Sequence, residues 1–302
     1  MERIAFDVPS YSFGGPGGPS VAITAGIHGN EQTGIHTAML LCRALESARL
    51  RGRATVIPFC NIEASKAVHR QAPADGLDLN RIFPGDPAGS YSQQLAHHIW
   101  GMTEGYDYLL DLHCCGINGS TYGMSYYSRH DWAERLLDSL MLRTVVHTKG
   151  TRGQLYIEAA ELRGQKSLLI ELPGGQPGGA IRLDAAEECA RGVMNYLIHI
   201  GVMDGAEIPF GQVRLCSCFL DFGDADRDGL FQPWVHPGDT VQKGQTLGLL
   251  DGTAVAAPCD GVATRVSPSR YAFRGQELLR ISELRRVQPG EVPLPPLEKP
   301  GA

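Results

Sequence analysis

The first 200 residues of the chain alternate between short apolar runs and longer segments with helical periodicity. Alternation of this kind is typical of a mostly parallel sheet that carries helices on both faces. We predict strands at Ile4–Val8, Val21–Ile27, Ala54–Phe59, Tyr108–Leu112, Thr144–His147 and Ser167–Leu172. We predict helices at Glu31–Ala48, Ser92–Met102, Asp131–Leu142, Gln154–Leu162 and Leu183–His199. The predicted fold class is therefore α/β, with a mixed, mostly parallel sheet between layers of helices.

The pattern of apolar residues and turns changes near residue 206. Helical periodicity disappears there, and short strand-like runs are separated by turns such as Pro237-Gly238-Asp239 and Asp260-Gly261. This pattern predicts a smaller, all-β barrel or sandwich. The last residues are rich in proline, which is typical of a poorly ordered tail. We therefore predict an α/β domain at 1–205, a β domain at 206–285 and a Pro-rich tail at 286–302.

Composition and charge argue against several classes of partner. The formal net charge is −6 and no basic block is present, so we expect neither nucleic acid nor an anionic membrane as a partner. No apolar stretch reaches the ~18 residues of a membrane span, and the first residues do not resemble a signal peptide. The eight cysteines form no CxxC pair. We therefore expect a cytoplasmic protein with reduced thiols.

Candidate metal ligands follow the second predicted strand. In Gly26-Ile27-His28-Gly29-Asn30-Glu31, an imidazole and a carboxylate are three residues apart across a turn that Gly29 allows to be tight. That spacing can bring both groups to one metal ion. By itself the pair has another explanation, because a loop histidine followed by an acidic residue that suits the dipole of the next helix looks the same.

A second strand also ends in a histidine, in Tyr108-Leu-Leu-Asp-Leu-His113. A hydrogen-bonded histidine at a strand end would look the same. Two histidines and one carboxylate, with a position left for water, are nevertheless a common ligand set of catalytic zinc. The sequence thus raises the hypothesis of a site built by His28, Glu31 and His113 at the carboxyl ends of neighbouring strands.

Glu171 interrupts the most apolar predicted strand, Ser-Leu-Leu-Ile-Glu-Leu. A carboxylate in a buried strand is costly unless it is paired or takes part in chemistry. A buried ion pair with an arginine would explain it. A carboxylate beside a metal-activated water, acting as general base and acid, would explain it equally well.

An irregular segment rich in Gly and Pro carries further polar residues. It contains Arg70 and the run Asp78-Leu-Asn80-Arg81-Ile-Phe-Pro-Gly. Two arginines and an asparagine there could bind a carboxylate through paired hydrogen bonds, although an arginine taken singly is more often a solvated surface charge.

Four of these motifs occur in an order that resembles one family. His28-Gly-Asn-Glu31, Asp78-Leu-Asn80-Arg81, Asp111-Leu-His113 and Glu171-Leu-Pro-Gly-Gly are similar to the succinylglutamate desuccinylase/aspartoacylase family, a branch of the zinc carboxypeptidase-like fold. The resemblance covers roughly residues 3–200, and the Gly-rich C-terminal region resembles the barrel of bacterial members.

The resemblance implies a function and a role for each residue. It implies a zinc-dependent amidohydrolase that removes an acyl group from a small N-acyl amino acid. His28, Glu31 and His113 match the zinc ligands, and Glu171 matches the general base and acid. The remaining matches are Arg70 to the residue that polarises the carbonyl, Asn80 and Arg81 to the pair that holds the α-carboxylate, and Asp78 to the carboxylate that orients His28.

One departure concerns the residues after His113. Cys114-Cys115 stand where many relatives have small hydroxyl or glycine residues. Two thiols close to a metal could be additional ligands, or they could only shape the pocket. Coordination by Cys114 would close the position that water needs.

Two other functions remain open at this stage. A metallocarboxypeptidase acting on short peptides would use the same metal and the same carboxylate-binding residues. The segment from Val235 also resembles the hammerhead turns of biotinyl and lipoyl carriers, which would make the chain a binding module or an inactive pseudoenzyme. The turn Ala257-Pro258-Cys259-Asp260 lacks the lysine that a carrier modifies, so we read the region as structural.

The identity of the acyl group and of the amino acid stays open. Side-chain recognition has candidates in Arg152, Arg163, Tyr126 and Tyr127. We expect a small-molecule substrate, and a homo-oligomer is an open alternative to a monomer.

Overall fold

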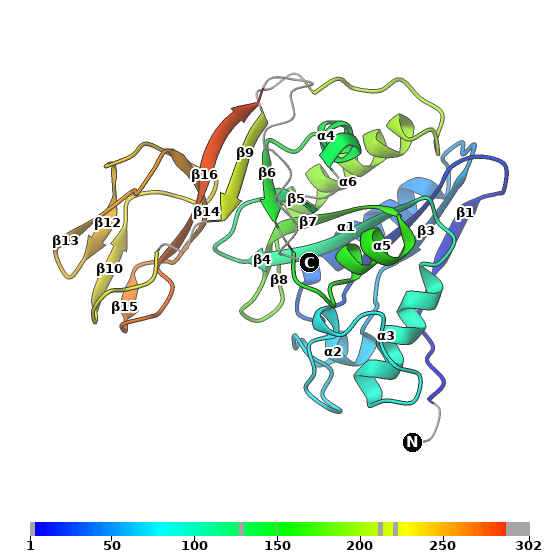
Figure 1. Cartoon of the computed structure of the whole chain (residues 1–302), viewed down its shortest axis with the longest axis horizontal. Helices are drawn as coiled ribbons and strands as arrows, with labels where there is room; N and C mark the ends of the chain where they lie inside the picture. The colour runs from blue at the N-terminus through cyan, green and yellow to red at the C-terminus, as the bar shows by residue number, and fades with distance from the viewer. Residues whose placement is uncertain (1–3, 127–129, 149, 211–213, 220–222, 288–302) are drawn as a thin grey trace, which may run out of the picture.

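A computed structural model describes residues 4–126, 130–148, 150–210, 214–219 and 223–287 (Figure 1). Its larger sheet is mixed and begins in the order β1-β3-β2-β4-β7-β5-β6-β9, with β8 beside β7. The strands of its first part are β1 (Tyr11–Gly14), β2 (Ser20–Ala25), β3 (Arg53–Ile57), β4 (Tyr108–Gly116), β5 (Tyr122–Tyr126), β6 (Thr144–Thr148), β7 (Lys166–Gly175), β8 (Ala180–Ile181) and β9 (Arg214–Phe219).

Most neighbours in this part of the sheet run parallel. The parallel pairs are β2–β3, β2–β4, β4–β7, β5–β6 and β6–β9, whereas β1–β3 and β5–β7 are antiparallel. The predicted mixed, mainly parallel α/β sheet is confirmed.

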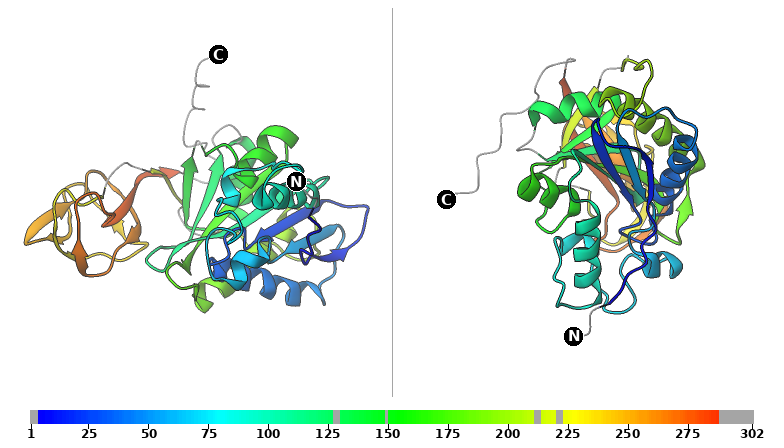
Figure 2. Two further views of the ribbon diagram at one scale, coloured as in Figure 1. Left: turned by 90° about the horizontal axis from the view of Figure 1, so that it is seen from below. Right: turned by 90° about the vertical axis from the view of Figure 1, so that its right-hand side faces the viewer.

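Helices cover both faces of the sheet (Figure 2, right). They are α1 (Gln32–Leu45), α2 (Ile62–Lys66), α3 (Tyr91–Met102), α4 (His130–Ser139), α5 (Leu155–Arg163) and α6 (Leu183–His199), with a short 3₁₀ turn, η1 (Leu79–Arg81). One hydrophobic core joins α1, α4 and α6 to the sheet, and another joins α3 and α5 to its opposite face.

Along β4, alternate side chains lie on opposite faces of the sheet. Leu110 and Leu112 belong to the core under α1 and α6, whereas Leu109 belongs to the core under α3 and α5. Side chains alternate between faces along a strand, so Asp111 and His113 lie on the face of Leu109. Two polar groups are thereby aligned at the end of a strand that is otherwise apolar.

The chain after residue 223 forms only strands among its described residues. They are β10 (Gly229–Pro233), β11 (Thr240–Val241), β12 (Thr246–Leu250), β13 (Thr253–Ala256), β14 (Gly261–Val266), β15 (Arg270–Ala272) and β16 (Leu279–Val287). Strands β13-β12-β10-β15 form a separate sheet, while β16, β14 and β11 continue the large sheet from β9. Phe231 and Leu247 of the small sheet share a hydrophobic core with Ile281 of β16.

Each helix and strand predicted for the first 200 residues overlaps an observed element, except the first predicted strand. The prediction of a strand at Ile4–Val8 is wrong, because this segment has no regular structure and the first strand is β1. Phe6 and Val8 instead pack against the core under α3, which explains their apolar character. Strand β5 was not predicted, and neither were the short elements β1, β8, α2 and η1.

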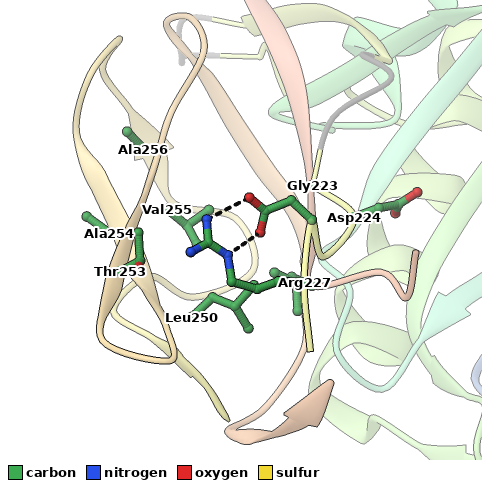
Figure 3. Close-up of a pocket in the computed structure, with 10 residues that line it drawn as sticks. Gly223, Asp224, Arg227, Leu250, Thr253, Ala254, Val255 and Ala256 are labelled. Carbon is green, nitrogen blue, oxygen red and sulfur yellow. Dashed lines mark hydrogen bonds and ion pairs between the residues drawn. The ribbon is translucent and has the colours of Figure 1, made fainter. Parts of the chain in front are cut away.

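A cavity of about 380 Å³ lies in the C-terminal segment (Figure 3). Its walls include Leu250, Val255 and Leu278, and Asp226 and Arg227, which form an ion pair, also line it. None of the candidate ligands from the sequence lines it. Within the part of the chain that the structure describes, no helix is long and apolar enough to cross a membrane.

We predict that Leu110→Ala lowers the free energy of unfolding by about 2–5 kcal/mol, because Leu110 is fully buried in a central strand. Leu183→Ala is the matched control: that side chain is 58% exposed, and we expect a change within about 0.5 kcal/mol. Urea denaturation of both variants measures the difference. Equal effects would contradict the assignment of Leu110 to the core.

Candidate metal centre and active site

The structure brings together the three ligands predicted from the sequence. His28 and Glu31 follow β2, and His113 lies on the neighbouring strand β4. His28 Nδ1 is 2.7 Å from Glu31 Oε1, and His113 Nδ1 is 2.8 Å from Glu31 Oε2. All three side chains are buried, and one donor atom from each lies within 4.8 Å of the other two.

A tight turn places His28 and Glu31 beside each other. The Glu31 N–H donates to the His28 carbonyl at 3.2 Å, and Glu31 is the N-cap of α1. Gly29, inside the turn, lies against α2: a Cβ there would be 1.9 Å from the backbone carbon of Ala64. Only glycine allows this approach, which explains the residue between the two ligands.

Each histidine is held from its far side by an aspartate. His28 Nε2 is 2.9 Å from Asp78 Oδ1, and His113 Nε2 is 3.0 Å from Asp111 Oδ2. The Thr24 hydroxyl donates to Asp111 Oδ1 at 2.7 Å. Each imidazole therefore has a fixed ring orientation, with Nδ1 directed at Glu31 and Nε2 at an aspartate.

The charges of the cluster change the protonation of its members. Burial lowers the pKa of His28, but the Glu31 charge and the Asp78 hydrogen bond outweigh it and raise that pKa. The pKa of His113 is likewise raised, since Asp111 and Glu31 outweigh burial. Burial opposes ionisation of Glu31, yet the two histidines lower its pKa. The two imidazoles therefore favour the ionised form of Glu31.

This donor set fits a divalent metal ion. Two imidazole nitrogens and one carboxylate are ligands that zinc prefers. Metal-bound histidines usually donate their second N–H to a carboxylate, which is the arrangement that Asp78 and Asp111 provide. The fit rests on these orientations, and the same set also suits cobalt or manganese.

Arg70 and Asp78 lie beside the cluster. The Arg70 Nε and Nη2 groups donate to Asp78 Oδ2 at 3.1 and 2.9 Å, and Nη1 donates to Glu31 Oε1 at 3.4 Å. The arginine is part-buried and faces the carboxylate of a candidate ligand.

Asn80 and Arg81 belong to η1, immediately after Asp78. The Asn80 Nδ2 atom lies 3.4 Å from His113 Nε2, and its Oδ1 accepts from the Leu155 N–H at 2.9 Å. The carbonyl end of this buried amide is thus used within the protein. Arg81 is exposed and donates to the Asn80 carbonyl at 2.7 Å.

Glu171 lies opposite His113 in the register between β7 and β4, and opposite Tyr122 in the register between β7 and β5. The Glu171 Oε2 atom is buried and has no hydrogen-bond partner. Burial raises the pKa of Glu171 to about 7, and the Glu31 charge adds to the rise. The sequence had left open that Glu171 forms a buried ion pair with an arginine. Among the described residues, no arginine contacts Glu171 Oε2.

The two cysteines after His113 lie outside the ligand group. Neither belongs to the cluster of His28, Glu31 and His113 in the described chain. The backbone N–H of Cys114 donates to Glu31 Oε2 at 3.0 Å, and the Cys115 thiol donates to the carbonyls of Ser120 and Leu172. These contacts favour a role in shaping the pocket.

The structure describes two of the four side chains that the sequence suggested for side-chain recognition, Arg152 and Arg163. Arg152 pairs with Glu158 at 2.6 Å. Arg163 stacks on Trp100, 3.4 Å from its ring centroid, near the start of β7 and thus at the sheet edge opposite Glu171. Tyr127 and the side chain of Tyr126 lie outside the described residues.

Two residues with clear positions in the site were not assigned a role from the sequence. Asp111 holds His113, and Tyr122 is the neighbour of Glu171 across β5 and β7. Asp111 could have been found, because residues two apart on a strand share a face. Tyr122 could not, since β5 was not predicted.

Comparisons with known proteins identify the family of this chain. The sequence profile of the succinylglutamate desuccinylase/aspartoacylase catalytic domain matches residues 17–200. The N-alpha-acetyl-L-2,4-diaminobutyric acid deacetylase of Halomonas elongata is 30% identical over 244 residues, 76% of this chain and 70% of the relative.

Solved structures show the same fold. A succinylglutamate desuccinylase/aspartoacylase from Rhodobacter sphaeroides has a TM-score of 0.79 at 26% identity, covering 92% of this chain and 90% of the other. The product-bound ectoine utilization protein from Ruegeria pomeroyi has a TM-score of 0.76 at 22% identity, covering 91% and 88%. The chain belongs to the succinylglutamate desuccinylase/aspartoacylase family, whose members are deacylases that hydrolyse amide bonds.

We predict that Asp111→Asn weakens zinc binding about 10- to 100-fold, because a neutral amide holds the His113 ring less firmly than a carboxylate does. Competition with a chelating dye measures the affinity. Asp107→Asn is the control, since Asp107 binds Ser20 at the far edge of the sheet. An unchanged affinity in Asp111→Asn would contradict the orienting contact.

Gly29→Ala should reduce both stability and metal binding, because the new methyl group collides with the backbone of α2. Gly101→Ala is a matched control: a Cβ at this position in α3 meets nothing within 4 Å. That control should be neutral or stabilise by up to about 1 kcal/mol. Thermal melts and zinc titration of both variants test the contrast, and a harmless Gly29→Ala would refute it.

Proposed function

We propose that the protein is a zinc-dependent deacylase that removes an acyl group from a small N-acyl amino acid. The observation that carries the proposal is the convergence of His28, Glu31 and His113, each histidine backed by an aspartate, beside a buried carboxyl group on Glu171. Family membership supports the reaction class, and the donor set supports zinc.

His28, Glu31 and His113 would hold the metal. When bound there, zinc supplies Lewis-acid chemistry: it polarises the amide carbonyl and makes a water nucleophilic near neutral pH. Asp78 and Asp111 keep the two rings in place during the reaction.

Glu171 is the proposed general base and acid. Its Oε2 atom has no competing hydrogen bond, so it can accept a proton from the attacking water and deliver it to the leaving amine. A pKa of about 7, raised by burial and by Glu31, suits both transfers at neutral pH.

Arg70 would stabilise the negative charge that develops on the carbonyl oxygen. Its guanidinium already lies 3.4 Å from Glu31 and is part-buried, where such a charge acts strongly. We propose that the η1 turn binds the α-carboxylate of the substrate. The exposed Arg81 would contact the carboxylate directly, and Asn80 would hold the turn beside His113.

The substrate is proposed to be small. The Halomonas relative is named as a deacetylase of an acetylated diamino acid, so N-acetyl amino acids come first in a substrate screen, followed by N-succinyl ones.

The division into 1–205, a β barrel or sandwich at 206–285, and a tail remains a prediction, as do the cytoplasmic location and the oligomeric state.

Glu171→Gln should retain zinc but lower kcat on the order of 10²- to 10⁴-fold, because the amide cannot accept the proton. Metal analysis and turnover of the best N-acyl amino acid test this together. His113→Ala is the contrasting variant and should lose zinc as well as activity. Turnover near that of the unmodified protein in Glu171→Gln would remove the residue from this role.

A parallel assay separates deacylation from peptide cleavage. The zinc-loaded protein is given N-acetyl amino acids and a series of dipeptides, and released amine is measured. Faster dipeptide cleavage would favour the metallocarboxypeptidase. No hydrolysis of either class would reject both proposals.

A further inference from the structure

Helix α2 ends in a backbone conformation that usually takes glycine. The Val68 N–H donates to the Ser65 carbonyl at 3.2 Å, and the His69 N–H donates to the Ala64 carbonyl at 2.9 Å. These two bonds form a Schellman motif, in which the residue after the C-cap is left-handed and is most often glycine. Here that residue is Val68, with a φ of 49°. A β-branched side chain is strained in this region, so local preference does not explain the valine.

The Val68 side chain rests on the hairpin between β7 and β8. A Cβ at Gly179 would lie 2.5 Å from Val68 Cγ1, so the valine packs directly on this glycine. Val68 is 41% exposed, and burial in a hydrophobic core therefore does not account for it either. The hairpin continues the strand that carries Glu171. The contact thus joins the end of α2 to the strand of the proposed base.

Helix α2 and the hairpin are both packed on the turn that carries the ligand pair. Gly29 of that turn lies against the backbone of α2. A Cβ at Gly175, the last residue of β7, would lie 3.2 Å from the Glu31 Cα. The Arg182 N–H, just after β8, donates to Thr33 Oγ1 in the first turn of α1 at 3.1 Å. The end of α2 therefore lies where three parts of the site meet.

Arg70 follows this point by two residues. Its guanidinium donates to Asp78 Oδ2 at 2.9 and 3.1 Å and to Glu31 Oε1 at 3.4 Å. The structure describes no helix or strand between α2 and η1, so no regular element holds the Arg70 backbone. The direction of the chain at Val68 consequently determines where the arginine side chain begins.

We propose that Val68 is a positioning residue that holds the Arg70 loop against the β7–β8 hairpin. The inference rests on the proposed deacylase function, in which Arg70 stabilises the charge on the carbonyl oxygen and Glu171 transfers the proton. Strained residues persist where the surrounding structure requires them, and they cluster at active sites. Glycine at position 68 would relieve the strain but leave the loop without its contact. Stability and catalysis should therefore respond differently to this change.

The test is Val68→Gly in the zinc-loaded protein, assayed on N-acetyl amino acids. The melting temperature should stay the same or rise, because glycine takes the left-handed conformation without strain. We expect kcat to fall about 10- to 100-fold, because Arg70 acts on the transition state and small displacements are costly there. KM should change less than about threefold. Val68→Thr keeps the branched shape and should retain most of the activity.

Asp251→Gly is the matched control for relief of backbone strain. Asp251 has the same φ, 49°, and a Cβ at Gly229 would lie 2.7 Å from the Asp251 Cβ. It lies in the turn between β12 and β13, in the separate small sheet. This variant should leave kcat unchanged. An unchanged kcat in Val68→Gly, or an equal loss in Val68→Thr or Asp251→Gly, would overturn the proposal.

Two neighbouring glycines test the contact itself. Gly178 and Gly179 are both left-handed, with φ of 75° and 71°, but a Cβ at Gly178 meets nothing within 4 Å. Alanine is strained at either position, and only at Gly179 does it collide with Val68. Gly179→Ala should therefore lower kcat more than Gly178→Ala, and the excess should disappear when Val68→Gly is added. Equal effects of the two alanines, or an excess that persists in the double variant, would contradict the contact.

An NMR measurement separates this inference from the proposed reaction. In protein with isotope-labelled arginine, the Arg70 Nε–H is bonded to Asp78 and should exchange slowly with water; Arg70→Lys identifies its signal. Faster exchange in Val68→Gly but not in Asp251→Gly would support the positioning role even if no amide is hydrolysed, and only the reaction proposal would then fail. An Arg70 signal that Val68→Gly leaves unchanged would overturn the inference even if the reaction is confirmed.

Discussion

The site depends on one carboxylate, Glu31, which is shared by two imidazoles. The two oxygens of Glu31 bind different histidines, one from its own turn and one from the neighbouring strand. This sharing is possible because β2 and β4 are parallel neighbours whose carboxyl ends meet at one edge of the sheet. Buried charges are tolerated there because each has a partner: an aspartate backs each histidine, and the Cys114 N–H and Arg70 contact Glu31.

Much of this could be predicted from the sequence because the signals were local. The alternation of apolar runs and helical segments predicted the parallel sheet, and strand ends located His28 and His113. The turn that ends at Glu31 could be predicted because Glu31 is only three residues after His28 and Gly29 lies between them. The wrong prediction at Ile4–Val8 also came from a local signal. Alternating apolar residues indicate that one side of a segment is buried, but they do not show whether the segment pairs with a strand or packs on a helix.

Contacts between distant segments could not be predicted. Strand β5 is short and contains glycine, so it gave no signal, and the position of Tyr122 beside Glu171 remained hidden. The contact between Val68 and Gly179 gave no signal either, because it depends on tertiary structure alone. The side-chain carbonyl of Asn80 likewise proved to accept from the Leu155 N–H, which no spacing indicated.

The continuation of the large sheet through β9 links the two halves of the chain. Strand β9 pairs with β6 on one side and with β16 on the other, so backbone hydrogen bonds run from the α/β layers into the C-terminal strands. An unpaired parallel edge would present a row of free backbone groups to other chains. The C-terminal strands therefore cover the edge of β6, and a cut at residue 205 would remove β9 and leave the backbone groups of that edge without their strand partner.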